Sequence, residues 1–111
     1  METEKNIAQM RKGVLEYCIL HILSQHEAYT SDIIDLLKKS HLIIVEGTLY
    51  PLLNRLKNDE LLTYRWEESR SGPPRKYYNI TDLGKIYLSD LDKSWKELVN
   101  SVNSLTTQSS N

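Results

Sequence analysis

The sequence predicts a mainly α-helical fold with a small antiparallel β-hairpin, arranged as a winged helix-turn-helix plus a long C-terminal dimerisation helix. Three observations support this prediction. Amphipathic helical patterns fill the N-terminal half, a Gly-Pro turn separates two β-favouring runs, and apolar residues recur every three or four positions over residues 88–105. A length of 111 residues with 40% hydrophobic and 26% charged residues suits one globular unit.

The first helix is expected from about Ile7 to Gln25. Its apolar residues recur at helical spacing, at Met10, Val14, Cys18, Ile19, Ile22 and Leu23. Leu15 and Leu20 widen this surface, so the helix should be covered on more than one side.

A second helix is expected from the segment Tyr29-Thr30-Ser31-Asp32 to about Lys39. Thr30 or Ser31 would cap it, with Asp32 in its first turn. The residues expected to point inward are Ile33, Ile34 and Leu37.

The third helix carries a one-sided apolar stripe at positions i, i+3, i+4 and i+7, formed by Leu49, Leu52, Leu53 and Leu56. Its opposite face is mostly polar and shows Thr48, Tyr50, Pro51, Asn54, Arg55 and Lys57. Pro51 has no N–H and crowds the carbonyl four residues back, which belongs to Gly47. We therefore expect this helix to start close to Gly47.

Two strands should follow, over Leu61–Glu67 and Arg75–Ile80. Aromatic residues that favour strands support both runs. The segment Ser71-Gly72-Pro73-Pro74 would break the pairing and form the tip of the wing. Because Tyr77 and Tyr78 are adjacent on one strand, we expect one of them to pack inward.

Thr81-Asp82 predicts the cap of a long final helix. This helix has an apolar seam with alternating steps of three and four residues, formed by Leu88, Leu91, Trp95, Leu98, Val102 and Leu105. An internal packing helix would show the same stripe, but this one extends beyond what a compact three-helix core would cover. We therefore expect a homodimer seam, with residues 1–81 as the winged helix-turn-helix domain and residues 82–111 as the dimerisation helix, one structural unit with the first helix.

Four segments of the chain resemble the PadR family of bacterial transcriptional regulators. They are Arg11-Lys12-Gly13-Val14-Leu15-Glu16, Glu46-Gly47-Thr48-Leu49-Tyr50-Pro51-Leu52-Leu53, Gly72-Pro73-Pro74-Arg75-Lys76-Tyr77-Tyr78 and Ile80-Thr81-Asp82-Leu83-Gly84. The single C-terminal helix is similar to that of the short branch, in which it builds the homodimer with the first helix. One departure is Val45, where such proteins often carry a Ser or Thr that caps the recognition helix.

The resemblance implies a repressor that binds a dyad-symmetric operator in double-stranded DNA. It also implies a sensing function, because in some short members a Trp of each C-terminal helix lines a cavity between the subunits. That cavity binds flat, apolar, often cationic compounds, and Trp95 in Lys93-Ser94-Trp95-Lys96 matches the position.

On DNA, the third helix would lie in the major groove, with Thr48, Tyr50, Asn54, Arg55 and Lys57 near bases or phosphates. The hydroxyls and free N–H groups of Tyr29, Thr30 and Ser31 suit a phosphate. The wing residues expected to hold the flanking backbone or minor groove are Arg70, Gly72, Arg75 and Lys76.

Two alternatives to this reading of the surface remain. In the first, the third helix and the hairpin are ordinary solvated surfaces with no binding function. In the second, the winged helix binds proteins rather than DNA. The second would favour apolar exposure on the third helix, where this sequence is polar. A net charge near −1 gives no global attraction to nucleic acid, so local cations must carry DNA binding.

Trp95 also has two interpretations. Two symmetry-related indoles would either fill the dimer core or leave a slot for a planar apolar or cationic ligand. Tyr17 and His21 lie one turn apart on the first helix and would line the same slot, although His21 also suits a partly buried residue with an ordinary hydrogen bond. A ligand-independent regulator with a packed core is equally consistent with the sequence.

Other functions find little support. Cys18 is the one cysteine, so no intrachain disulfide forms, and the three histidines and Cys18 show no paired metal-ligand spacing. No glycine-rich phosphate loop, nucleophile elbow or carboxylate cluster is present, so we expect no catalytic residues, no cofactor and no enzyme activity. The N-terminus lacks signal-peptide character, and the apolar run from Val14 to Leu23 is too short to span a bilayer. We expect a cytoplasmic protein with no membrane partner.

Overall fold

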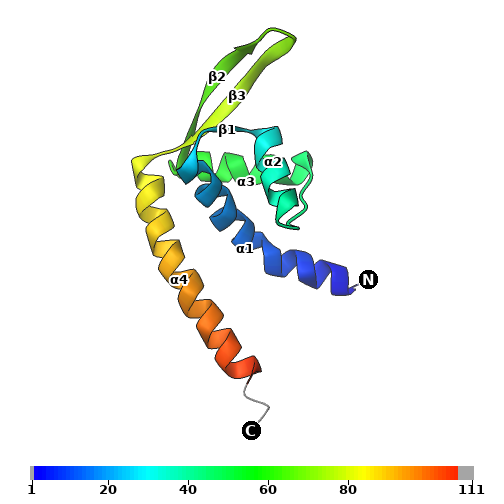
Figure 1. Ribbon diagram of the computed structural model, residues 1–111, viewed down its shortest axis with the longest axis vertical. Coiled ribbons are helices and arrows are strands. Elements are labelled where there is room, and N and C mark those ends of the chain that lie inside the picture. The colour runs from blue at the N-terminus through cyan, green and yellow to red at the C-terminus, as the bar shows by residue number, and fades with distance from the viewer. Residues whose placement is uncertain (1, 108–111) are drawn as a thin grey trace.

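The computed structural model describes residues 2–107 and contains four helices and one three-stranded antiparallel sheet (Figure 1). In chain order, the elements are α1 (Glu2–Gln25), β1 (Ala28–Tyr29), α2 (Thr30–Lys39), α3 (Glu46–Asn58), β2 (Leu62–Ser69), β3 (Gly72–Ile80) and α4 (Asp82–Thr106). The predicted mainly α, winged helix-turn-helix fold is confirmed. Residues 108–111 of the expected dimerisation segment lie outside the described residues.

The hydrophobic core lies where α1, α2 and α3 meet the base of the sheet. The predicted apolar stripe of α3 is buried throughout, with Leu49 and Leu53 fully inaccessible to solvent. Ile19 and Leu20 of α1 and Ile33 of α2 are equally inaccessible. Burial of one face of α3 leaves its polar face on the surface.

The helix α1 begins at Glu2 rather than near Ile7, so the predicted start was wrong. Residues 2–13 are all exposed, and hydrophobic periodicity therefore gave no signal for this extension. Glu2 and Glu4 lie in the first turn, where carboxylates stabilise the positive end of the helix dipole. The extension projects from the helical body (Figure 1).

The N-cap of α2 differs from the predicted Thr30 or Ser31, whereas α3 starts close to Gly47, as predicted. The N-cap of α2 is Tyr29, whose N–H donates to Asp32 Oδ2 over 3.1 Å, whereas Thr30 is buried. Helix α3 begins at Glu46, one residue before Gly47, with Val45 as N-cap. Within residues 2–107 Val45 makes no side-chain cap hydrogen bond, because valine has no polar side-chain atom.

The wing differs from the prediction at its tip. Gly72, Pro73 and Pro74 belong to β3, so the turn is formed by Arg70 and Ser71 rather than by residues 71–74. Proline is compatible with a strand where its missing N–H is not needed for pairing, and the register is irregular between Glu67 and Ser69.

A third strand, β1, was not predicted. Ala28 and Tyr29 pair with Tyr78 and Tyr77 of β3, which makes β3 the central strand. Two residues are too few to show a period-2 pattern. The prediction that one of the adjacent tyrosines packs inward is confirmed, because Tyr78 is 1% exposed while Tyr77 lies on the opposite face of the strand.

The helix α4 starts as predicted, with Thr81 Oγ1 accepting a hydrogen bond from the N–H of Gly84 over 2.9 Å. Its first turn lies against the base of the wing. Farther along, the seam residues Leu98, Val102 and Leu105 are 56%, 48% and 76% exposed. The lower half of α4 projects away from the helical body (Figure 1), and its apolar stripe is about half or more exposed.

Candidate nucleic-acid interface

A hollow of about 410 Å³ separates the starts of α2 and α3 from the wing. It brings together six residues predicted from sequence as DNA contacts, with three others. The lining residues are Tyr29, Thr30, Ser31, Glu46, Tyr50, Trp66, Pro74, Arg75 and Lys76. Its shape and position follow from β1, which places the start of α2 directly beside the central strand.

Aromatic rings hold the two wing cations of this hollow. The guanidinium carbon of Arg75 lies 5.4 Å from the centre of the Tyr29 ring. Lys76 Nζ lies 4.5 Å from the Tyr64 ring centre and 5.6 Å from that of Trp66. Cation–π attraction of this kind restricts both side chains without neutralising their charge, so they remain available to an anion.

The polar face of α3 lies exposed, as the sequence predicted. Thr48, Tyr50, Asn54 and Lys57 are all solvent-accessible, whereas the leucines of the opposite face are buried. Side chains of these types can donate to phosphates and to the base edges of a major groove. Lys57 Nζ also lies 5.6 Å from the Tyr64 ring, which links the end of α3 to the wing.

Arg55 is directed differently from the other residues on this face. Its guanidinium forms an ion pair with the carboxylate of Glu16 on α1. The Arg55 side chain is 54% exposed and that of Glu16 only 14%, so the pair is partly sheltered. Arg55 therefore ties α3 to α1, and the structure does not place it in the hollow.

The wing tip lies apart from the hollow. Arg70 and Gly72 are exposed and do not line it. Three residues that were not predicted as contacts do line it: Glu46, Trp66 and Pro74. Trp66 is 61% exposed, and an indole on the surface of a strand is the sequence signal that would have identified it.

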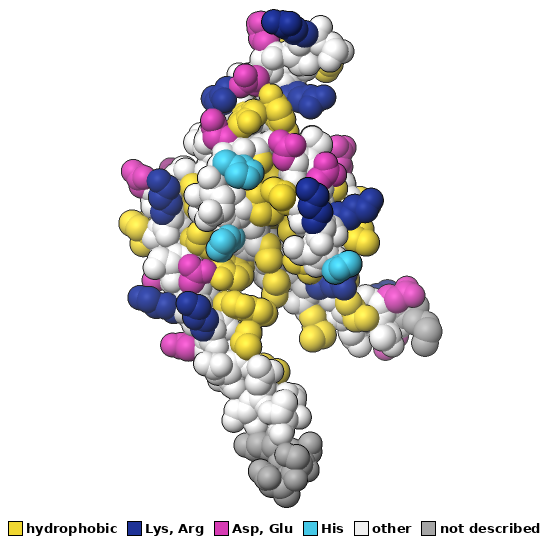
Figure 2. Space-filling model, viewed as in Figure 1, with side chains coloured by type: hydrophobic (Ala, Val, Ile, Leu, Met, Phe, Trp, Pro, Cys, Tyr) yellow, Lys and Arg dark blue, Asp and Glu magenta, His cyan; other side chains and the backbone are white. Residues whose placement is uncertain are grey.

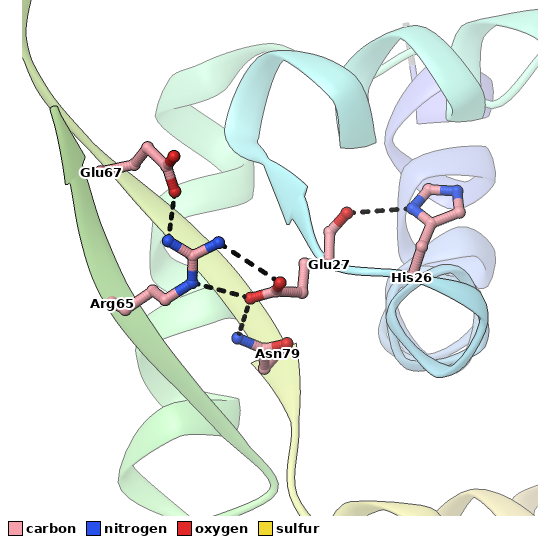
Figure 3. Close-up of polar contacts among 5 residues, drawn as sticks. All are labelled: His26, Glu27, Arg65, Glu67 and Asn79. Atoms are coloured by element: carbon pink, nitrogen blue, oxygen red, sulfur yellow. Dashed lines mark hydrogen bonds and ion pairs between the residues drawn. The ribbon is translucent and has the colours of Figure 1, made fainter. Parts of the chain in front are cut away.

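A polar network joins the start of β1 to strands β2 and β3 (Figure 3). Glu27 Oε2 accepts from Arg65 Nε over 3.0 Å and from Asn79 Nδ2 over 2.6 Å, while Arg65 also pairs with Glu67. The hydrogen bonds from Arg65 and Asn79 lower the pKa of Glu27. Because two carboxylates neutralise Arg65, its role is to join β1 to the sheet rather than to bind an external anion.

A separate hollow of about 270 Å³ lies between α1 and α4. It is lined by Met10, Gly13, Val14, Tyr17, Leu91, Ser94, Trp95 and Leu98. Trp95 is 38% exposed, and its ring centre lies 6.2 Å from that of Tyr17. In the view of Figure 2, hydrophobic side chains gather along the notch between α4 and the helical body.

Tyr17 joins the two helices that form this second hollow. Its hydroxyl donates to Asp92 Oδ1 over 2.5 Å, and this hydrogen bond raises the pKa of Tyr17 to about 12. His21 does not line the hollow. It is exposed rather than partly buried, and its ring contacts that of Tyr17 edge-on at 6.3 Å. The slot predicted for Trp95, Tyr17 and His21 lies between two subunits, so its sharing by His21 stays a prediction.

Residues 2–107 contain no group of three or more His, Cys, Asp or Glu side chains that could hold a metal ion. Over the same range, each helix is too short or too polar to cross a bilayer.

The amino-acid sequence of this chain is similar to those of known transcriptional regulators. Residues 19–90 match the model of the Transcriptional regulator PadR-like family. An uncharacterized protein of Lysinibacillus sphaericus is 36% identical over 90 residues, which cover 78% of this chain and 83% of that protein.

Solved structures of similar proteins match most of this chain. A PadR-like transcription factor from Bacteroides fragilis is 58% identical with a TM-score of 0.78, covering 92% of this chain and 99% of that one. A PadR-like transcriptional regulator from Bacillus cereus is 43% identical with a TM-score of 0.76, covering 87% of this chain and 95% of that one.

Proposed function

Because this chain belongs to the PadR-like family of transcriptional regulators, which bind DNA and are not enzymes, we propose that it is a sequence-specific repressor acting as a homodimer. The observation that carries this proposal is the hollow between α2, α3 and the wing, with Arg75 and Lys76 held beside the exposed face of α3. A recognition helix and a cationic wing that border one hollow suit a major groove and its neighbouring phosphates.

In this proposal, residues 1–81 form the DNA-binding domain and residues 82–111 form the dimerisation helix. The exposed apolar seam of α4 supports dimerisation, because a monomeric protein rarely exposes such an apolar stripe to water. Two α4 helices packed together would set the separation of the recognition helices, which must meet successive major grooves about 34 Å apart.

Sequencing of genomic fragments retained by the purified protein tests the DNA-binding function. We expect a dyad-symmetric sequence near a promoter, and retention of fragments with no shared sequence would contradict specific recognition.

Leu98→Asp tests the seam, because it places a charge in the apolar stripe. Sedimentation should then report a monomer and operator binding should weaken. Asn100→Asp is the matched control, since it adds the same charge at an exposed position two residues away, on the opposite side of α4. If Leu98→Asp keeps the sedimentation mass of the wild type, the seam assignment is wrong.

We further propose that a planar apolar or cationic ligand binds at Trp95 and relieves repression. The partly exposed indole and the nearby Tyr17 ring offer aromatic faces that suit a flat cation. A ligand that prefers one dimer shape would shift the separation of the recognition helices. Titration of the Trp66→Phe variant with a planar cationic dye isolates the fluorescence of Trp95. Absence of quenching would leave a ligand-independent regulator.

A further inference from the structure

A third hollow lies on the other side of α1 and shares no described lining residue with the Trp95 hollow. It measures about 650 Å³ and lies between the N-terminal half of α1, residues 43–45 and the start of α3. Leu15, Ile44 and Leu52 line it, and Ile43 and Val45 beside them are 68% and 65% exposed. Volume and apolar lining are in the range of small-molecule sites, and the exposed β-branched residues would gain from an occupant.

The charge around this hollow has one sign. Lys5, Arg11 and Lys12 of α1 line it, and no lining residue in the described chain is acidic. Within residues 2–107 these three cations also form no ion pair with a carboxylate. An apolar trough edged by unpaired cations fits an occupant with an apolar body and an anionic head.

We propose that this hollow binds an amphipathic carboxylate, with its hydrocarbon chain over Leu15, Ile44 and Leu52 and its carboxylate at Arg11 and Lys12. Desolvation of the chain supplies the affinity, and charge-assisted hydrogen bonds to the guanidinium orient the head group. Each added methylene that leaves water should tighten binding by up to about fourfold.

The same hollow contacts the DNA-reading helix. Thr48 and Pro51 of α3 are among its lining residues, so an occupant touches the first turns of that helix. An effect of the ligand on DNA binding rests on the proposed function. If the ligand binds more tightly to one position of α3 than to another, it changes the affinity for the operator.

Calorimetric titration of the full-length protein with decanoate, below its micelle concentration, tests the site. We expect binding by the wild type, weaker binding of octanoate, and at least tenfold weaker binding of decanol, which lacks the charge. The variant Arg11→Ala/Lys12→Ala should bind decanoate at least tenfold more weakly. Its matched control is Lys38→Ala/Lys39→Ala, which removes two exposed cations of α2 outside the hollow and should bind normally.

The Trp95→Ala variant distinguishes this site from the Trp95 hollow. Decanoate binding that is retained in Arg11→Ala/Lys12→Ala but abolished in Trp95→Ala would overturn the proposal. So would equal affinity for decanol and decanoate. Absence of binding together with an altered sedimentation mass of Ile43→Glu would assign the trough to a second copy of the chain. Because calorimetry needs no DNA, failure of the proposed DNA function would leave this test intact.

Discussion

Gly84 sits where α4 leaves the wing, and replacement by alanine should measure how tightly this junction is packed. A Cβ atom built at Gly84 would lie 2.2 Å from the carbonyl oxygen of Leu61 and 2.7 Å from Cγ1 of Ile80. That carbonyl also accepts a hydrogen bond from the Thr81 N–H over 3.1 Å. The obstructing atom thus belongs to a paired backbone segment rather than to a flexible side chain.

The magnitude follows from this contact. Overpacking of a closed site costs about 1–3 kcal/mol, and the upper end applies because backbone must move. Alanine itself favours a helix by about 1 kcal/mol over glycine. We therefore expect Gly84→Ala to lower the free energy of unfolding by about 2 kcal/mol and, by displacing α4, to weaken operator binding.

Gly47→Ala is the matched control. Gly47 also lies in the first turn of a helix, but within the described chain nothing lies within 4 Å of the Cβ position. This variant should be as stable as the wild type, or more stable by up to about 1 kcal/mol. Urea unfolding followed by circular dichroism measures both variants, at one protein concentration because the proposed dimer would make stability depend on concentration. Equal stability of the two alanine variants would refute the packing argument.

Three further predictions concern the polar contacts. Replacing Arg75 and Lys76 by alanine should weaken operator binding. It should also reduce the slope of log affinity against log salt concentration by about 0.9 for each phosphate that is no longer neutralised. An unchanged slope would mean that the wing does not contact phosphates. Glu16→Gln should lower the free energy of unfolding by about 1–2 kcal/mol, between the values for exposed and buried ion pairs. Adding Arg55→Ala to this variant should lower it little further. Additive losses in urea unfolding would mean that Glu16 and Arg55 do not act as a pair. Hydrogen bonds lower the pKa of Glu27 in the folded chain, so as the pH falls the unfolded chain takes up a proton on Glu27 first. The Glu27 carboxylate therefore stabilises the fold above its unfolded pKa. This stabilisation is lost as the pH falls through the lower pKa of the folded state. Acid titration of stability should therefore show a steeper loss below about pH 4 for the wild type than for Glu27→Gln, and parallel curves would contradict this role.

The sequence by itself determined the elements whose residues repeat a pattern over several turns. The one-sided stripe of α3 and the cap at Thr81 depend on local chemistry, and both were found where they were expected. The long helix α4 was also expected, but Leu88 of its predicted dimer seam is buried in the chain's own core and Leu91 packs against that core. The wing was also visible, since aromatic runs on either side of a turn specify a hairpin.

Only the tertiary structure decided how these pieces meet. Strand β1 exists because two residues happen to lie along β3, a contact between distant segments that no local pattern encodes. The same applies to Arg55, whose place on an exposed helix face predicted a DNA contact, while its distant partner Glu16 directs it toward α1. His21 lies outside the single-chain hollow of Trp95 for a similar reason, because the packing of α1 against α4 determines which side of α1 lines that hollow. Periodicity specifies which face of a helix is apolar, but the packing of helices against one another specifies what that face contacts.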